Sequence, residues 1–447
     1  MIMLAVKGAG SYHPCAKCKA IRGRLPPSNF GDEYFQHYIS ADPSLWDQYT
    51  IEEFAAACAE VKTAWTESRA RGEEVETSLG ISRDACLTSP LYRVPVSVYW
   101  DPMHCLWASG GLGQYEINQW LREVRRHGVP WATLQGFVLQ VKVPGPTRCN
   151  VQLEQRYVGG PTFHLRGFAA EMLVIVPWLI AFGDMVLAPG GLMFAHMACL
   201  RLLYDIQVII MLGDAAHRIV GLLDQIVAAH HDLYLALYPR CMKPKLHFLR
   251  HLPGLIDYFK CVLTCFSGER HHKASKRMAA FLYKNMATTM LRRSSVACLH
   301  DLVDESLFQE VTLGARAKRQ QSRWMPLIRS LGFTPRVRSL SLRSALRVRA
   351  GNFVLYKRDT AADGVSWDAG IAVEFYELRS GDLVDFFMIA CAHTILEQQN
   401  QPSSWLYSST VEHVVVHHKR IFHVAPYVQD GAHVRVILPT YAKDIWR

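Results

Sequence analysis

The longest apolar run of the chain, Met172 to Phe182, has 11 residues and is followed by Gly183-Asp184. A helix that crosses a membrane needs roughly 20 apolar residues. Pro177 and Asp184 would also be poorly accommodated in lipid. We therefore expect a buried helix and no transmembrane segment. The apolar stretch Met1 to Val6 is too short for a secretory signal, so the sequence predicts a protein that is neither membrane-bound nor secreted.

Hydrophobic periodicity divides the 447 residues into four regions. Residues 1–90 are loop-rich and contain a CxxC pair. Residues 91–300 begin with a predicted strand, Val94–Trp100, and a predicted helix, Tyr115–Arg126. They continue into a helical zone (about 165–265) with apolar residues at three- and four-residue spacing. Residues 301–350 are predicted to be a basic linker or arm. Residues 351–447 are predicted to form a β-barrel or sandwich-like domain. Its expected strands are Asn352–Tyr356, Ile371–Leu378, Leu383–Ala390, Val411–His417 and His433–Leu438.

The charge of the chain is concentrated in one segment. Residues 311–350 hold ten basic side chains and no acid, and the formal net charge of the whole chain is +10. Such a segment needs solvent counterions or an anionic partner, so it is either a solvated linker or an arm that binds nucleic acid through phosphate contacts. The arm's candidate DNA-binding residues are Arg316, Lys318, Arg319, Arg323, Arg336 and Arg338.

A first candidate site is the pair Cys15 and Cys18. Two residues between two cysteines allow both thiolates to bind one metal in a tight turn, as in a zinc knuckle. A complete zinc site needs four ligands, and His13 is the nearest further candidate. The alternative is a pair of ordinary thiols. We expect the two sulfurs to converge, with the missing ligands supplied by His13 or from later in the chain.

A second candidate site is Asp101 and His104, at the end of the predicted strand. An acid and an imidazole at a strand end are typical of a functional site. The alternative interpretation is an aspartate that caps the following helix and a histidine that is satisfied in a turn.

A third group lies in residues 243–277. His247 and His251, with Cys241, Cys261 and Cys265 nearby, could bind zinc, but the flanking Leu and Phe residues favour packing instead. On a helix, Glu269 would share one face with the cations Lys273 and Lys276. Together with Arg277, this arrangement suits a metal beside a phosphate backbone. The alternative is a solvated basic helix in which the glutamate forms salt bridges.

The order of these motifs (KGxG and CxxC, then WDPMH, then KPKLHFLRHLP, then FSGERHHKASKR) resembles the CACTA-type, or En/Spm-like, DDE DNA transposases over roughly residues 4–290. The resemblance implies an α/β fold with a partial RNase H-like core and a large helical insertion before the last acid. It also implies that Glu269 is the final acid of the catalytic triad, and that Asp101 and His104 form the family's D-x2-H signature. It makes DNA the expected partner and the nucleus the expected location, and it is compatible with a homo-oligomer.

Family members hold two Mg2+ or Mn2+ ions between two aspartates and one glutamate. In this sequence both aspartates would precede Met1, and Asp32 follows the CxxC pair without a preceding strand. A two-metal site needs all its acids, so the chain as given is expected to bind DNA without cleaving it. We also expect Asp101, His104 and Glu269 to lie close together. Two other functions stay open: a zinc-stabilised protein-interaction module, and a hydrolase or transferase that uses Asp101 and His104 as an acid–base pair.

Overall fold

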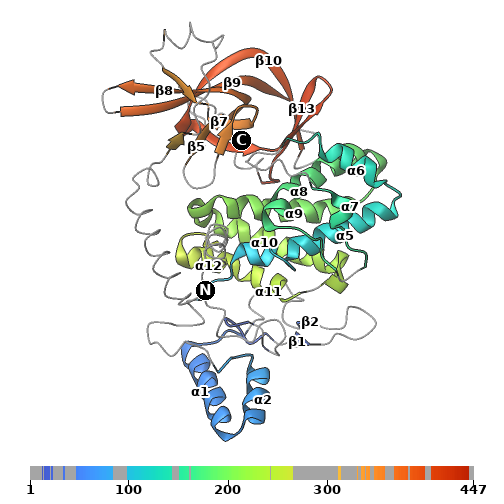
Figure 1. Cartoon of the computed structure of the whole chain (residues 1–447), viewed down its shortest axis with the longest axis vertical. Coiled ribbons are helices and arrows are strands. Elements are labelled where there is room, and N and C mark those ends of the chain that lie inside the picture. Colours follow the sequence, from blue (N-terminus) through green and yellow to red (C-terminus); the bar gives the residue numbers. More distant parts are fainter. Residues whose placement is uncertain are drawn as a thin grey trace, which may run out of the picture.

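The computed structural model of the chain has a helical domain between a helical hairpin and a β domain (Figure 1). The structure describes residues 13, 15–20, 22–23, 34–35, 47–83, 98–142, 151–160, 163–241, 243–264, 311–313, 330, 334–337, 339–342, 347–357, 367–380, 383–397 and 404–441.

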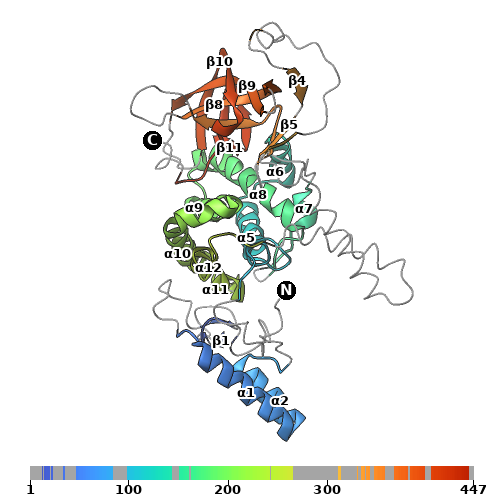
Figure 2. The ribbon, with the colours of Figure 1, turned by 90° about the vertical axis from the view of Figure 1, so that its left-hand side faces the viewer.

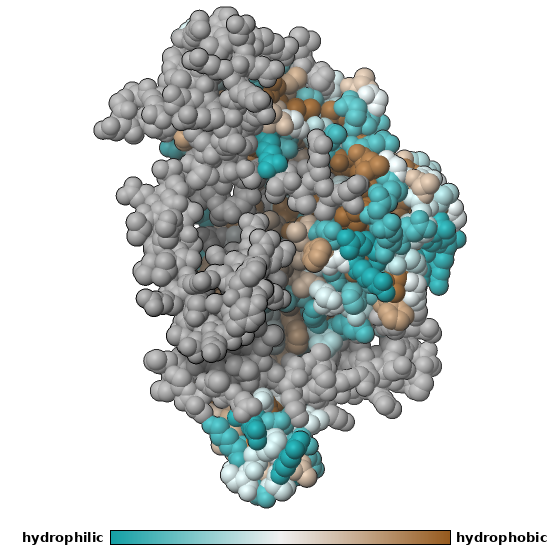
Figure 3. All heavy atoms as spheres, in the orientation of Figure 1, coloured by the Kyte–Doolittle hydropathy of each residue, from teal (hydrophilic) through white to brown (hydrophobic). Residues whose placement is uncertain are grey.

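Helices α1 (Ile51–Glu67) and α2 (Arg69–Leu79) form the hairpin. Thr50 and Glu53 cap α1 reciprocally in a capping box, while Ser68 ends α1 and caps α2. A Cβ at Gly72 would lie 2.4 Å from the Trp65 ring, so glycine allows the two helices to approach there. The hairpin buries a small apolar cluster together with Ala16 and Val98. Its outer surface is largely hydrophilic (Figure 3, bottom).

The helical domain follows from residue 98 onward. Its α-helices are α4 (Pro102–Leu106), α5 (Leu112–Arg126), α6 (Trp131–Val138), α7 (Leu153–Arg156), α8 (Ala169–Phe182), α9 (Phe194–Met211), α10 (Val220–Leu237), α11 (Pro244–Arg250) and α12 (Leu252–Phe259). Shorter π or 3-10 turns are η3 (Gly183–Leu187), η4 (Ala188–Gly190), η5 (Gly213–Ile219) and η6 (Pro239–Cys241). Helices α8 to α12 fall within the helical zone predicted over about 165–265, and α5 contains the predicted helix Tyr115–Arg126.

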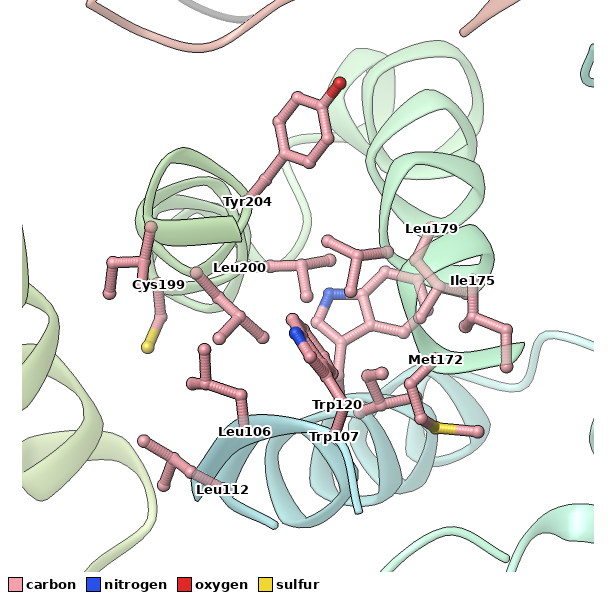
Figure 4. Packing of buried hydrophobic residues seen from close by; sticks show 14 of the residues in the cluster. Leu106, Trp107, Leu112, Trp120, Met172, Ile175, Leu179, Cys199, Leu200 and Tyr204 are labelled. Atoms are coloured by element: carbon pink, nitrogen blue, oxygen red, sulfur yellow. The ribbon is translucent and has the colours of Figure 1, made fainter. Parts of the chain in front are cut away.

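The core of this domain lies between α5, α8 and α9. Trp107 and Trp120 are both buried there, and Figure 4 shows them surrounded by apolar side chains from α4, α5, α8 and α9. The run that contains α8 and the helix α9 are long and apolar enough to cross a membrane by length and composition, but 72% and 67% of their apolar windows are buried inside the structure. Burial of this kind fits core helices, as the sequence analysis expected for Met172–Phe182. In the same core, Asp184 forms a buried ion pair with Arg201.

The β domain is an antiparallel sheet of eight strands with the order β11-β7-β8-β9-β10-β13-β12, and β4 pairs with β8 outside this path. These strands are β4 (Thr334–Val337), β7 (Phe353–Lys357), β8 (Trp367–Ser380), β9 (Leu383–Glu397), β10 (Ser404–His417), β11 (Ile421–Ala425), β12 (Tyr427–Asp430) and β13 (His433–Ile437). The sheet packs apolar residues on both faces: Val354 and Tyr356 belong to one cluster, and Phe353 and Leu355 to another. Each of the five strands predicted beyond residue 350 overlaps an observed strand.

Two smaller sheets complete the architecture. Strands β1 (Arg22–Gly23) and β2 (Tyr34–Phe35) pair with each other, and β3 (Val311–Leu313), β5 (Ser339–Leu342) and β6 (Arg347–Arg349) form a three-stranded sheet. Strands β3 to β6 lie in the segment 301–350 that the sequence analysis treats as a linker. Four described pieces of this segment are therefore paired in sheets, and β4 is part of the β domain.

The C-terminal tail, residues 437–441, joins the β domain to the helical domain. The Asp205 carboxylate of α9 accepts hydrogen bonds from the Thr440 amide, at 2.8 Å, and from the Thr440 hydroxyl. The Tyr204 hydroxyl lies 3.4 Å from the Ile437 carbonyl. Val428, Ile437 and Tyr441 also belong to the hydrophobic core of the helical domain. In the view of Figure 2 the β domain is stacked end-on against α6, α8 and α9.

The described residues thus combine helices with antiparallel sheets, which agrees with a mixed fold of helices and strands. One predicted element is wrong in its described part, because Val98, Tyr99 and Trp100 form no strand. Tyr99 and Trp100 are instead fixed by ring contacts with Phe259 and Phe248. The tertiary packing of these aromatic side chains outweighs the local β propensity. No RNase H-like arrangement is confirmed among the described residues.

Candidate metal centre

The N-terminal half of the site is a short loop held against the start of α1. The amide of Lys19 donates to the Asp47 carbonyl at 2.6 Å, and the amide of Tyr49 donates to the Lys17 carbonyl at 3.1 Å. The Lys19 ammonium also forms ion pairs with Asp47 and Glu53. These bonds tie residues 17–19 to residues 47–53, so the CxxC turn and the α1–α2 hairpin are joined to each other.

The other half comes from α11 and from the junction between α11 and α12. His247 lies inside α11, and His251 ends α11 and precedes α12. Residues four positions apart on a helix share a face, so both imidazoles point to the same side. Pro244 begins α11 at a position where proline is favoured. The spacing of the two histidines therefore follows directly from helix geometry.

Cys15, Cys18, His247 and His251 converge on one buried point. The Cys18 sulfur lies 3.1 Å from Nε2 of His247, and the Cys15 sulfur lies 3.4 Å from Nε2 of His251. The two Nε2 atoms are 3.1 Å apart, and the Cys18 sulfur is 3.6 Å from Nε2 of His251. All four ligand atoms lie within 4.8 Å of one another. None of the four residues is more than 7% exposed.

These separations match the geometry of a tetrahedral metal site. Zinc with bonds of about 2.3 Å to sulfur and about 2.0 Å to nitrogen separates its ligand atoms by roughly 3.3–3.8 Å. The observed sulfur–nitrogen and nitrogen–nitrogen distances of 3.1–3.6 Å lie at or slightly below this range. Two sulfurs and two imidazole nitrogens are also the donor set that Zn2+ prefers. The cluster could therefore bind zinc.

The surroundings of Cys15 favour its ionised form, a thiolate, at the point where the four side chains meet. Burial raises the pKa of Cys15, but the hydrogen bond with Cys18 and the charges of His251 and His247 outweigh burial and hold that pKa well below its usual value. The hydrogen bond with Cys15, together with burial, raises the pKa of Cys18. The Lys17 amide also points at the Cys15 sulfur, at 3.4 Å. A bound dication would favour the ionised form of both thiols.

The structure corrects the sequence analysis on the second half of the site. The predicted convergence of Cys15 and Cys18 is confirmed, and the partners do come from later in the chain. The sequence analysis favoured packing for His247 and His251, and both residues are buried, but their rings also turn the Nε2 atoms to the two sulfurs. The described residues His13, Cys241 and Cys261 are not part of this cluster. Cys265 lies outside the described residues.

The segment that carries Asp101 and His104 contacts α11. Trp100 stacks on Phe248 of α11, with ring centroids 4.0 Å apart and an angle of 7° between the planes. The Asp101 carboxylate accepts from the amides of Met103 and His104, at 3.2 Å each, and it is also bonded to the His104 ring. Asp101 is thus the N-cap of α4. The capping interpretation is confirmed. Asp101 is also paired with the His104 imidazole, as the acid–base hypothesis requires.

Two substitutions of Asp101 test how much its N-cap contributes to the stability of the chain. We expect Asp101→Ala to lower the free energy of unfolding by about 1 kcal/mol, because two amides at the start of α4 lose their acceptor. Asp101→Asn should stay close to wild type, since asparagine is as good an N-cap as aspartate. Urea denaturation of both variants measures this difference. Equal losses in the two variants would show that the carboxylate charge, and not the cap, is what stabilises the chain.

The other predicted site residues cannot be placed. Outside the described residues lie the predicted catalytic acid and most of the predicted DNA-binding residues: Glu269, Lys273, Lys276, Arg277, Arg316, Lys318, Arg319, Arg323 and Arg338. Arg336 is in β4, but its side chain is not described. The expected proximity of Asp101, His104 and Glu269 therefore stays a prediction. The last described segment before Glu269 contacts Tyr99, because the Leu263 amide donates to the Tyr99 hydroxyl at 3.1 Å.

Comparison with known proteins finds no matching protein family, curated protein or solved structure.

Proposed function

We propose that the chain is a zinc-stabilised, nucleic-acid-binding protein of transposase descent. The observation that carries the proposal is the closure of Cys15 and Cys18 on His247 and His251, 229 to 236 positions away. Closure over such a distance joins two of the motifs on which the transposase resemblance rests. A third motif, WDPMH, contacts the segment that carries the two histidines, because Trp100 stacks on Phe248.

The zinc would have a structural role. Structural zinc sites have four protein ligands, whereas catalytic sites keep one position for water or substrate. Here the four ligands complete the tetrahedron and are all buried. The ion would fasten the segment 15–20, and with it the α1–α2 hairpin, to α11 and α12. The resemblance also implies that Glu269 binds Mg2+ or Mn2+. That site would be separate from this centre.

Nucleic acid is the proposed partner because the excess positive charge has no acidic counterpart in its own segment. Ten cations between 311 and 350 equal the formal net charge of the chain. Arginine is the commoner basic residue there, and its planar guanidinium suits bidentate contact with phosphate. The contact would be electrostatic, with little sequence preference, since phosphates carry no sequence information.

We expect the full chain to bind labelled duplex DNA with an affinity that falls as salt increases. Each phosphate contact contributes a slope of about −0.9 to log K against log salt, so engagement of half the arm gives a slope of about −4 to −5. Changing Arg316, Arg319, Arg323, Arg336 and Arg338 to glutamine should bring the slope close to zero. Fluorescence anisotropy at several salt concentrations measures both slopes.

The matched control is the double variant Arg69→Gln and Arg71→Gln. These two exposed arginines are on α2 and already form ion pairs with Glu73 and Glu74, so the control should keep the wild-type slope. A slope near zero in the wild-type chain would refute DNA binding. It would leave the zinc-stabilised protein-interaction module as the better account of the same metal centre.

A further inference from the structure

The centre of the helical domain contains a second cluster of metal-ligating side chains. Glu116 is on α5, Cys199 on α9 and His230 on α10. Their ligand atoms lie within 4.8 Å of one another, and Nε2 of His230 is 2.8 Å from one carboxylate oxygen of Glu116. All three residues are 0% exposed. This cluster shares no residue with the Cys15–Cys18–His247–His251 centre.

Hydrogen bonds inside the protein satisfy this cluster only in part: Glu116 bonds to His230 and to Cys199. The second carboxylate oxygen of Glu116 and Nδ1 of His230 are buried and have no hydrogen-bond partner among the described residues. Burying a polar atom without a partner costs on the order of 1–3 kcal/mol, more for a charged group. Such an atom in a core is an indication of an ion or a water molecule that binds there. The Glu116 carboxylate therefore has free capacity directed into a closed, apolar core.

We propose that Glu116, Cys199 and His230 form a second zinc site, which clamps helices α5, α9 and α10 together. A thiolate, an imidazole nitrogen and a carboxylate are zinc ligands, whereas Mg2+ and Ca2+ take oxygen ligands. The second oxygen of Glu116 can complete the coordination. Helical bundles commonly hold metals in their cores through side chains on facing helices.

The charges balance in the proposed site. Zn2+ binds as the Cys199 thiol releases its proton to solvent, and the thiolate and the Glu116 carboxylate together neutralise the dication. His230 coordinates as neutral imidazole. A buried site without net charge avoids the large cost of an unpaired ion in the core. The buried Tyr234 ring lies next to the site, with its centroid 5.8 Å from that of His230.

The experiment is a zinc titration of the full chain, stripped of metal by a chelator and followed by native mass spectrometry. We expect two tightly bound zinc ions per chain in the wild type. Glu116→Gln and Cys199→Ser should each bind one ion. The double variant Cys15→Ser and Cys18→Ser should also bind one. Cys105→Ser is the matched control: its thiol is buried near the same core but is not part of either cluster, so it should bind two.

The outcomes separate this inference from the proposed function. A wild type that binds one ion, lost on mutation of Cys15 and Cys18, overturns the second site and leaves the first. One ion that is lost in Glu116→Gln but kept without Cys15 and Cys18 supports the second site and overturns the first. Two ions retained by both Glu116→Gln and Cys199→Ser also overturn the proposal. If either variant fails to fold, Co2+ bound to the wild type gives the answer, because a one-thiolate site and a two-thiolate site differ in their absorption spectra.

Discussion

Replacing Cys18 with serine is expected to detach the N-terminal segment from the helical domain and to destabilise the chain by on the order of 5 kcal/mol. The mutation removes a sulfur that contacts both His247 and His251, and three ligands hold structural zinc much more weakly than four. The binding free energy of a structural zinc ion contributes directly to folding. Zinc removal by a chelator should destabilise the wild-type chain by at least as much, because the proposed site of Glu116, Cys199 and His230 would lose its ion as well.

Hydrogen exchange would show where the loss occurs. The amides of Lys19 and Tyr49, which bond to Asp47 and Lys17, should lose protection first. The amides of α11 and α12 should follow, while those of α9, in the middle of the large core, should keep their protection. Local opening of this kind is what a detached segment produces.

The control for this experiment is Cys58→Ser on α1. Cys58 is a half-buried thiol outside the metal cluster, so its replacement tests thiol loss without ligand loss. We expect a change within about 1 kcal/mol, and the same loss of stability on zinc removal as in the wild-type chain. If Cys18→Ser behaved like Cys58→Ser, the four side chains would be a packed cluster of thiols and imidazoles that binds no metal.

Half of the metal centre was predictable from the sequence. The CxxC pair is a local signal, since both ligands lie in one turn. The histidines have the i, i+4 spacing of a helical ligand pair, but Leu246, Phe248 and Leu249 around them suggested packing. The structure shows why this argument misleads: the centre is buried, so the helix that supplies its ligands must also be apolar. Apolar flanks are thus compatible with a structural zinc site.

The cluster of Glu116, Cys199 and His230 was not predicted, because its members come from three helices without any local spacing. The available signal was Glu116 itself. It stands in a helix where Ile117, Trp120 and Leu121 form the apolar face, and every residue from 112 to 121 is buried. An acid at such a position needs a partner, but a single sequence does not say which residue it is.

The fold was predictable where the hydrophobic periodicity is strong and where the helices and strands are long. The α8–α12 region and the strands beyond residue 350 have clear apolar patterns. The Val94–Trp100 prediction failed because β propensity in a short aromatic stretch cannot be distinguished from packing of the same aromatic rings against helices. The packing of the C-terminal tail on α9 could not be predicted from the sequence either, because it depends on a contact between Asp205 and Thr440, 235 positions apart.

The contact between Asp205 and Thr440 leads to a further prediction: the free energy of unfolding should decrease as the pH rises from about 4 to 7. Burial raises the pKa of Asp205 to about 7 from its ordinary value of 3.8, and the hydrogen bonds from Thr440 offset this only in part. Between these two values the folded chain binds a proton that the unfolded chain has released. Stability therefore falls with increasing pH in this window. The full shift corresponds to about 4 kcal/mol, which is present below pH 4 and lost above pH 7.

Asp205→Asn isolates this contribution. The asparagine carbonyl can accept from the Thr440 amide, as Asp205 does at 2.8 Å, and its amide can donate to the Thr440 hydroxyl. The tail contact is thus retained, while the ionisable group is gone. We expect the difference in unfolding free energy between wild type and variant to change by about 4 kcal/mol between pH 4 and pH 8, in favour of the variant at the higher pH.

Urea denaturation at a series of pH values measures this difference, with Asp257→Asn on the exposed end of α12 as the control. A constant difference across the series would mean that Asp205 is ionised in the folded chain throughout, and that Thr440 and Arg201 together offset its burial.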